Sequence, residues 1–145
     1  MPLLNYSTNI NHNRTVGEIM QKLAKAGAHQ MLQDYSGGVV TALSFKIKTK
    51  FGEIAFRLPA DVEAVKAVLR KQFPRKIWKP EQAANISWRI LKDWVEAQLA
   101  LIETGMVTVE QVFLPYAQFS KTGETVYEMF ERQRYGNLLT DRKET

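Results

Sequence analysis

The segment VVTALSFKIKTKFGEIAFRLP (39–59) contains two runs in which apolar and polar side chains alternate. In the first run, Val39, Leu43, Phe45 and Ile47 stand at odd positions, and lysines occupy even positions from Lys46 onward. A period of two indicates a half-buried strand. Phe51-Gly52 predicts a turn, and a second alternating run ends at a proline. The segment therefore predicts an antiparallel hairpin whose outer face carries Lys46, Lys48 and Arg57.

The sequence before this hairpin predicts one more strand in the sheet. Ala28–Tyr35 is joined to the hairpin by Ser36-Gly37-Gly38, a turn signal. Further upstream, Thr15-Val16-Gly17-Glu18 has the form of a capping box and predicts a helix over 16–26 that ends at Gly27. Residues 3–8 are interpreted as a short strand.

Helical patterns dominate the sequence after the hairpin. Asp61 predicts an N-cap for a helix that reaches Phe73, and residues 74–80 form a linker. Residues 81–104 give the strongest helical pattern, in which a narrow polar stripe interrupts an otherwise apolar surface, so this helix should be central to the core or to an oligomer interface. Capping boxes at Thr108 and Thr125 predict two short helices, the second ending near Gly136.

This order of elements predicts an α+β fold, with a small antiparallel meander sheet packed against helices and a long central helix in the C-terminal half. The length of 145 residues favours one α+β domain over residues 1–136, followed by a flexible C-terminal tail at 137–145. Hydrophobic residues make up 45% and charged residues 24%, which excludes a disordered chain. No apolar run is long enough to cross a bilayer and the start lacks a signal-peptide pattern, so we expect a cytoplasmic protein with no membrane partner.

Catalytic motifs are absent from the sequence. There is no cysteine for a disulfide, a thiolate nucleophile or a zinc site. His12 and His29 are separated by the first predicted helix, and the carboxylates around the sheet have no diagnostic metal-binding spacing. We therefore expect no catalytic residue, no metal and no cofactor, and a protein that is not an enzyme.

Positive charge is concentrated in the middle of the chain. Residues 39–80 carry ten basic and three acidic side chains, whereas residues 81–145 carry seven and ten. Basic side chains next to aromatic ones are typical of nucleic-acid-binding surfaces, because cations bind phosphates and aromatic rings stack on bases. A solvated surface with Phe73 and Trp78 as core anchors is the competing interpretation. The predicted nucleic-acid-binding residues are Lys46, Lys48, Arg57, Lys66, Arg70, Lys71, Arg75, Lys76, Trp78 and Lys79.

Three segments carry a resemblance to a known group of proteins. Gly52–Ala60 (GEIAFRLPA), Trp88–Glu103 (WRILKDWVEAQLALIE) and Val112–Tyr116 (VFLPY) resemble small uncharacterised proteins of tailed bacteriophages and prophages. The resemblance implies a phage protein that acts in the cytoplasm of the host cell, in DNA metabolism or against host defence. It assigns no role to any residue.

Three functional hypotheses follow from the sequence. The leading one is a non-enzymatic accessory protein that binds single- or double-stranded nucleic acid through its basic residues. The first alternative is a protein-interaction module, either an inhibitor of a host defence complex or a homo-oligomeric scaffold, which uses the acidic C-terminal part and the helix at 81–104. The second is a protein that sequesters a small nucleotide beside Arg57 and Arg70 without hydrolysing it.

Overall fold

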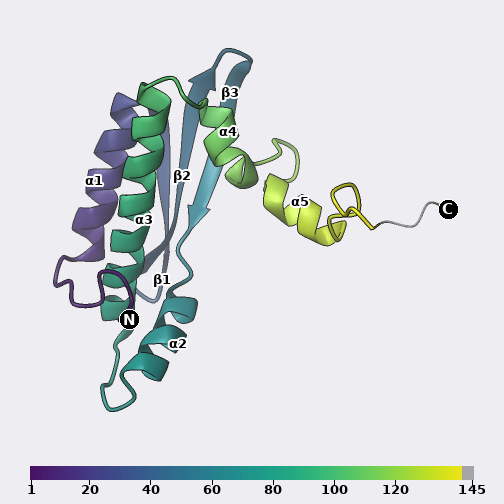
Figure 1. Ribbon diagram of the computed structural model, residues 1–145. Helices are drawn as coiled ribbons and strands as arrows, with labels where there is room; N and C mark the ends of the chain where they lie inside the picture. Colours follow the sequence, from purple (N-terminus) through teal and green to yellow (C-terminus); the bar gives the residue numbers. More distant parts are fainter. Residues whose placement is uncertain (142–145) are drawn as a thin grey trace.

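A three-stranded antiparallel sheet forms the centre of the computed structural model, which describes residues 1–141 (Figure 1). The strands β1 (Ala28–Ser36), β2 (Val39–Thr49) and β3 (Gly52–Pro59) follow one another as a meander in the order β1-β2-β3. Gly37 and Gly38 have φ angles of 58° and 83°, as the two central residues of a tight hairpin turn require. The predicted meander is confirmed.

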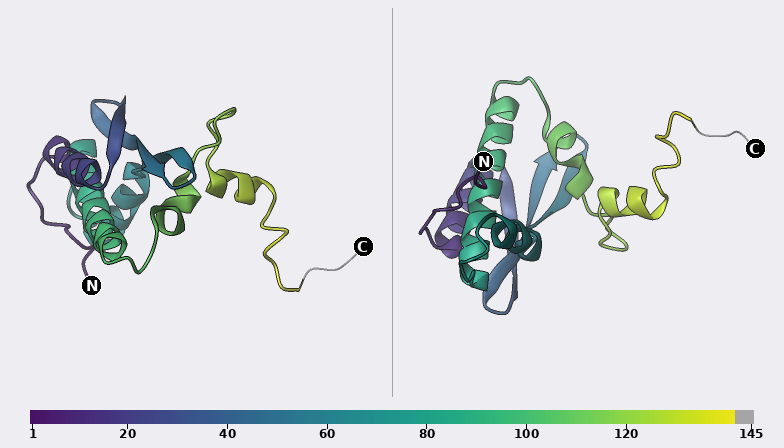
Figure 2. Two further views of the ribbon diagram at one scale, coloured as in Figure 1. Left: turned by 90° about the horizontal axis from the view of Figure 1, so that it is seen from above. Right: turned by 60° about the horizontal axis from the view of Figure 1, so that its bottom comes forward.

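Two helices cover one face of the sheet. α1 (His12–Lys25) and α3 (Pro80–Glu103) lie side by side on this face (Figure 2). Trp88 of α3 is completely buried, and its indole N–H donates a hydrogen bond to the backbone carbonyl of Val40 at 2.8 Å. Phe45 and Phe56 stack beneath it in the same core at 5.4 Å between ring centroids. The α+β class and the central place of the long helix are therefore confirmed.

The helix α2 (Val62–Gln72) lies at the end of the sheet where the N-terminus is found (Figure 1). As predicted, Asp61 caps it, accepting a hydrogen bond from the backbone N–H of Ala64 at 3.0 Å. Leu69 and Trp78 form a second apolar cluster with the first turns of α3. This cluster fixes both α2 and the linker between α2 and α3.

The N-terminal segment is not a strand. The backbone N–H of Tyr6 bonds to the carbonyl of Leu3 at 3.1 Å, and Asn5 has a φ of 62°, so residues 3–8 form turns. Tyr6 stacks on Phe73 at 5.2 Å between ring centroids. Packing against α2 therefore decides the shape of this segment, which its local alternation could not reveal.

The start of α1 also differs from the prediction. Asn11 is the N-cap, and its side chain accepts a hydrogen bond from the backbone N–H of Asn13 at 2.8 Å. Thr15 lies inside the helix and is buried, so Thr15 and Glu18 do not form a capping box. The expected end is confirmed, because Gly27 follows the helix with a φ of 110°.

The C-terminal part consists of α4 (Val109–Phe113), the 3-10 helix η1 (Leu114–Tyr116) and α5 (Val126–Arg132). The capping boxes at Thr108 and Thr125 are confirmed. The backbone N–H of Gln118 bonds to the carbonyl of Ala55 at 2.8 Å and so attaches this part to the free edge of β3. Beyond this point α5 extends away from the sheet (Figures 1 and 2). Residues 142–145 of the expected tail lie outside the described residues.

None of the helices within residues 1–141 has the length and the apolar character needed to span a bilayer.

Candidate nucleic-acid interface

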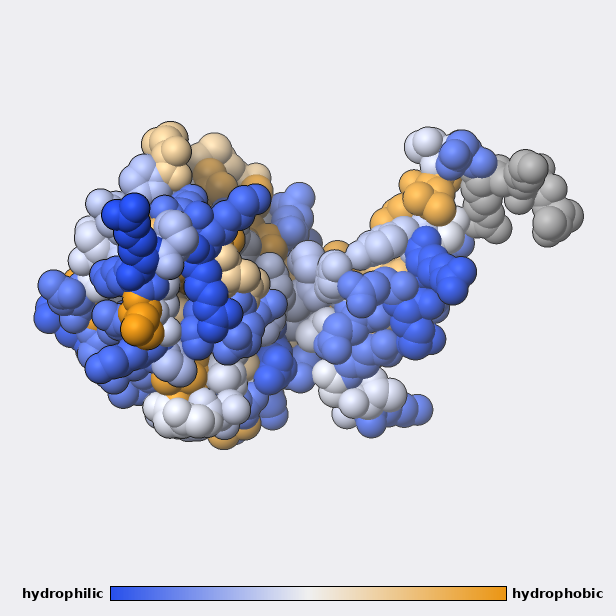
Figure 3. Space-filling model, turned by 90° about the horizontal axis from the view of Figure 1, so that it is seen from below, coloured by the Kyte–Doolittle hydropathy of each residue, from blue (hydrophilic) through white to orange (hydrophobic). Residues whose placement is uncertain are grey.

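Six cations lie together on α2 and on the linker that follows it, and we call this surface the basic end. Lys66 and Arg70 are four residues apart and share one flank of α2, while Lys71 follows in its last turn. All but the half-buried Lys66 are exposed. Figure 3 views this end of the molecule and shows strongly hydrophilic side chains over most of it. The basic end comprises Lys66, Arg70, Lys71, Arg75, Lys76 and Lys79.

The linker is held in place by its aromatic residues. Phe73 and Trp78 contact each other at 5.8 Å between ring centroids, and both pack on the second apolar cluster. Between them, the backbone N–H of Lys76 bonds to the carbonyl of Phe73 at 3.1 Å. The cations at positions 75 and 76 therefore project from a turn fixed at both ends.

Trp78 cannot stack on a base in this structure. Its side chain is only 5% exposed, and the ammonium group of Lys76 lies 4.2 Å from its ring centroid. The competing interpretation of Trp78 as a core anchor agrees with this burial, and the ring would have to leave the cluster before it could stack on a base. Burial in the cluster with Leu69 is the physical reason.

The six cations of the basic end have no carboxylate partners within residues 1–141. Among residues 1–141, every ion pair involves other basic side chains. Unpaired cations that are fixed on one surface create a local positive potential, which attracts polyanions. The basic end is therefore the described surface best suited to contact phosphate groups.

The three predicted sheet residues lie elsewhere. Lys46, Lys48 and Arg57 share the outer face of the sheet, as expected from the register of β2 and β3. Arg57 is paired with Asp34 at 3.0 Å, and the ammonium group of Lys46 lies 3.8 Å from the carboxylate of Glu53. These pairs remove much of the positive charge from this face.

The two groups of basic residues also lie at different places along the sheet. Lys48 lies opposite Glu53 in the register of β2 and β3, close to the β2–β3 turn. This turn lies at the end of the sheet opposite to α2 (Figure 1). The structure therefore does not bring all the predicted site residues onto one continuous face. It gathers the six of the basic end and separates them from Lys46 and Lys48.

A shallow hollow of about 580 Å³ lies on the outer face of the sheet. Leu32 and Ala55 provide apolar surface there, and Arg57 and Lys46 provide charge. Arg70 does not line this hollow, so a nucleotide bound there would not contact the two arginines of the nucleotide hypothesis together.

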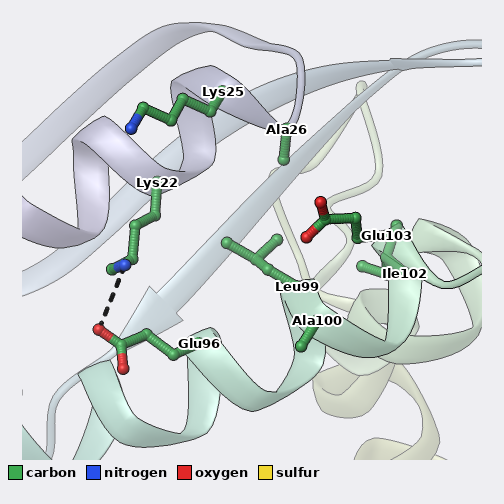
Figure 4. Close-up of a pocket in the computed structure, with 8 residues that line it drawn as sticks. All are labelled: Lys22, Lys25, Ala26, Glu96, Leu99, Ala100, Ile102 and Glu103. Carbon is green, nitrogen blue, oxygen red and sulfur yellow. Dashed lines mark ion pairs between the residues drawn. The ribbon is translucent and has the colours of Figure 1, made fainter.

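A second hollow, of about 550 Å³, lies between the C-terminal halves of α1 and α3 (Figure 4). The ammonium group of Lys22 lies 3.5 Å from the carboxylate of Glu96 across it, and Leu99 supplies an apolar wall. Its charged groups have both signs, and no aromatic ring lines it to stack on a base. This hollow therefore offers no specific site for a nucleotide.

A polar seam, which the sequence pattern did not predict, joins α1 to α3. The guanidinium group of Arg89 donates hydrogen bonds to Glu18 at 2.9 Å and to the hydroxyl of Thr15 at 3.1 Å. Lys92 contacts Glu18 at 3.5 Å and Glu96 at 2.6 Å. The polar stripe of the long helix thus faces another helix. Charged residues at a spacing of four on both helices are the signal that could have revealed the seam.

The seam carries perturbed acidic groups. The hydrogen bond from Arg89 lowers the pKa of the Glu18 carboxyl, with further lowering from the charges of Arg89 and Lys92. The hydrogen bond from Lys92 lowers the pKa of the Glu96 carboxyl in the same way. Because these carboxylates hold two helices together, we assign them a structural role.

His12, the first residue of α1, makes a further polar contact between α1 and α3. Its backbone N–H donates a hydrogen bond to the side-chain oxygen of Asn85 at 2.7 Å. His12 is only 2% exposed, and its Nδ1 has no hydrogen-bond partner in the part of the chain that the structure describes. Burial lowers the pKa of His12, although the charge of Glu81 acts in the opposite direction. Within residues 1–141, no three histidine or acidic side chains gather as a metal site.

Comparison with known proteins gives no relative: no family model, curated protein or solved structure matches this chain significantly.

Proposed function

We propose that this protein is a non-enzymatic nucleic-acid-binding protein that contacts phosphates through its basic end. One observation carries the proposal: six cations are displayed on one end of the molecule, and no carboxylate of the described part of the chain pairs with them. Fixed cations bind the phosphate backbone and release its condensed counterions. In this proposal, the excess of basic side chains in residues 39–80 serves to bind phosphate groups.

Binding of this kind is independent of base sequence. The basic end presents cations, whereas its aromatic side chains, Phe73 and Trp78, pack in the apolar cluster. Phosphate contacts position a protein on nucleic acid, and base contacts are needed to read its sequence. We therefore expect similar affinity for oligonucleotides of equal length and different sequence.

The test is fluorescence anisotropy with single-stranded and duplex oligonucleotides over salt concentrations from about 50 to 200 mM. Replacement of Arg75 and Lys76 by glutamine should reduce the slope of log K against log salt by about two, or one for each lost phosphate contact. Replacement of Lys48 and Lys50 by glutamine is the matched control, because it removes the same charge at the opposite end of the sheet. Equal slopes for the two double variants would refute the assignment to the basic end, and no binding at low salt would refute the function.

We place this activity in the cytoplasm of a phage-infected host cell, on the resemblance of Gly52–Ala60, Trp88–Glu103 and Val112–Tyr116 to small phage proteins. An accessory role in DNA metabolism or in antagonism of host defence fits that setting.

A protein-interaction module is the second candidate, and the C-terminal part favours it. The helix α5 has only seven residues, and none of them is buried. Isolated helices of this length are marginal in water. Tyr127 of α5 and Phe119, which precedes this helix, are both exposed. Capture of a host protein by the full chain, and not by a chain that ends before Val126, would support this candidate.

A further inference from the structure

The strand β1 has a free edge. It pairs with β2 on one side, and no other strand within residues 1–141 pairs with its other side. Its nine residues include neither proline nor lysine, which natural proteins use to protect such edges. We propose that β1 pairs antiparallel with β1 of a second copy of this chain and forms a symmetric dimer with a continuous six-stranded sheet.

The hydrogen-bond pattern shows which groups of β1 are free. The carbonyl of Ala55 accepts a hydrogen bond from Gln118, so it points away from β2. Because backbone groups alternate in direction along an antiparallel pair, the opposite residue, Lys46, directs its backbone groups toward β1. Gln30 is the partner of Lys46 there. The backbone groups of Met31 and Gln33, one and three positions further on, consequently point outward from the sheet.

The regular part of β1 is self-complementary about Leu32. Register shifts occur between Ala28 and Gln30 and between Asp34 and Tyr35, so the undisturbed part is Gln30–Asp34, with Leu32 at its centre. A two-fold axis at Leu32 places Met31 opposite the partner copy's residue 33, and each such pair exchanges two backbone hydrogen bonds.

Side chains also match in this arrangement. Leu32 is 64% exposed and would meet its own copy as a non-hydrogen-bonded pair, the kind in which side chains approach most closely. The amide of Gln30 would lie opposite the carboxylate of Asp34 from the other copy. Only one oxygen of Asp34 is used by Arg57, and no hydrogen bond within residues 1–141 uses the Gln30 side chain. A symmetric interface requires this kind of self-complementarity.

The flank of α1 above this edge provides an independent observation. The sulfur of Met20 contacts the side-chain amide of Gln33 at 3.1 Å, which places Met20 over β1. Gly17 lies three residues earlier on the same flank, and a Cβ added there would meet nothing within 4 Å. Glycine weakens the middle of a helix, and nothing in the single chain requires it. In the dimer, the two copies of α1 would approach each other along this flank, where a glycine permits close contact.

The first test is the mass of the full chain in solution. Sedimentation equilibrium of the wild type should give twice the chain mass of 16.6 kDa at micromolar concentration. Leu32→Lys and Gly17→Arg should both give monomers with unchanged circular dichroism, because Leu32 is exposed and a Cβ added at position 17 meets nothing within 4 Å in the single chain. Met106→Lys is the matched control at another exposed apolar side chain and should stay dimeric. A wild type that is monomeric at about 100 μM would overturn the proposal.

Disulfide trapping distinguishes this interface from any other. The chain contains no cysteine, so Leu32→Cys introduces a single thiol. At the two-fold axis the two thiols would lie within disulfide distance, and mild oxidation should link nearly all of the protein. Phe51→Cys at the β2–β3 turn should remain largely unlinked. Equal linking of both variants, or a dimer that persists in Leu32→Lys, would place the interface elsewhere. None of these results depends on nucleic-acid binding.

Discussion

Arg89 and Glu18 lie 71 residues apart in the sequence, yet their side chains meet at 2.9 Å between α3 and α1. The side chains are 18% and 28% exposed, so this ion pair is shielded from water more than a typical surface pair. Breaking such a pair leaves the remaining charge poorly solvated. The polar seam therefore contributes to the stability of the helix pair that covers the sheet.

Replacement of Arg89 by alanine should lower the free energy of unfolding by about 1–3 kcal/mol, because Glu18 and Thr15 lose their shared donor. Urea unfolding followed by circular dichroism measures this change. Arg132→Ala is the control, since its pair with Glu124 is mostly exposed on the arginine side and should contribute much less to stability. Equal losses in the two variants would contradict the role given to the seam.

Acid should weaken the seam. The pKa values of Glu18 and Glu96 are lowered in the folded chain, so the unfolded chain takes up protons first as the pH falls. Their contribution is complete above the unfolded pKa near 4.5 and is lost as the pH falls through the lower folded values. Urea midpoints between about pH 7 and pH 3 should show this loss, and the Glu18→Gln variant should show less of it. A wild type and a variant with the same pH dependence would contradict this prediction.

His12 should produce a separate effect at higher pH. Its folded pKa is below 6.5 because the imidazole is buried, so the unfolded chain binds a proton that the folded chain excludes. Stability should be complete above about pH 6.5 and should decline as the pH falls toward the folded pKa. His12→Leu should remove this decline between about pH 7.5 and pH 5.5, as measured by thermal unfolding. A decline that survives in His12→Leu would place its origin at another group.

The two buried tryptophans should respond differently to replacement by phenylalanine. Among the described residues the indole N–H of Trp78 has no hydrogen-bond acceptor. Trp78→Phe therefore loses packing but also removes an unsatisfied donor, and stability should stay within about 1 kcal/mol of the wild type. Trp88→Phe breaks the bond to the carbonyl of Val40 and should cost about 1–3 kcal/mol more. Chemical unfolding of both variants measures the difference.

The same variant tests the placement of Trp78 in the core. Nucleic-acid binding by Trp78→Phe should equal that of the wild type in the anisotropy titration, because the ring of Trp78 is buried and does not contact the ligand. A folded Trp78→Phe protein that loses most of its affinity would show that the ring leaves the core to stack on a base.

Much of the fold could be predicted from local pattern. The alternation through Phe45 and Ile47 predicted β2, and the glycines at 37 and 38 predicted its turn, because strand period and turn conformation depend on neighbouring residues. The cap at Thr125 was predicted for the same reason. Residues 3–8 were misassigned because contact with Phe73, far along the chain, determines their shape.

The candidate site was predicted less well than the fold. A count of charges placed Arg57 with the α2 cations, but it could not show that Asp34 neutralises this arginine across the sheet. It also could not show that Trp78 points inward, because an aromatic residue in a basic linker suits a core and a binding surface equally well. Pairing and burial depend on tertiary contacts that a single sequence does not display.

The long separation between the two sides of the polar seam has a consequence for the order of folding. The meander forms from strands that are neighbours in the chain, whereas His12 and Asn85 must close a loop of 73 residues before they meet. Loop closure of this size costs entropy before any contact compensates for it, so α1 and α3 should join after the hairpins have formed. Substitutions in the seam should then accelerate unfolding and leave the rate of refolding almost unchanged.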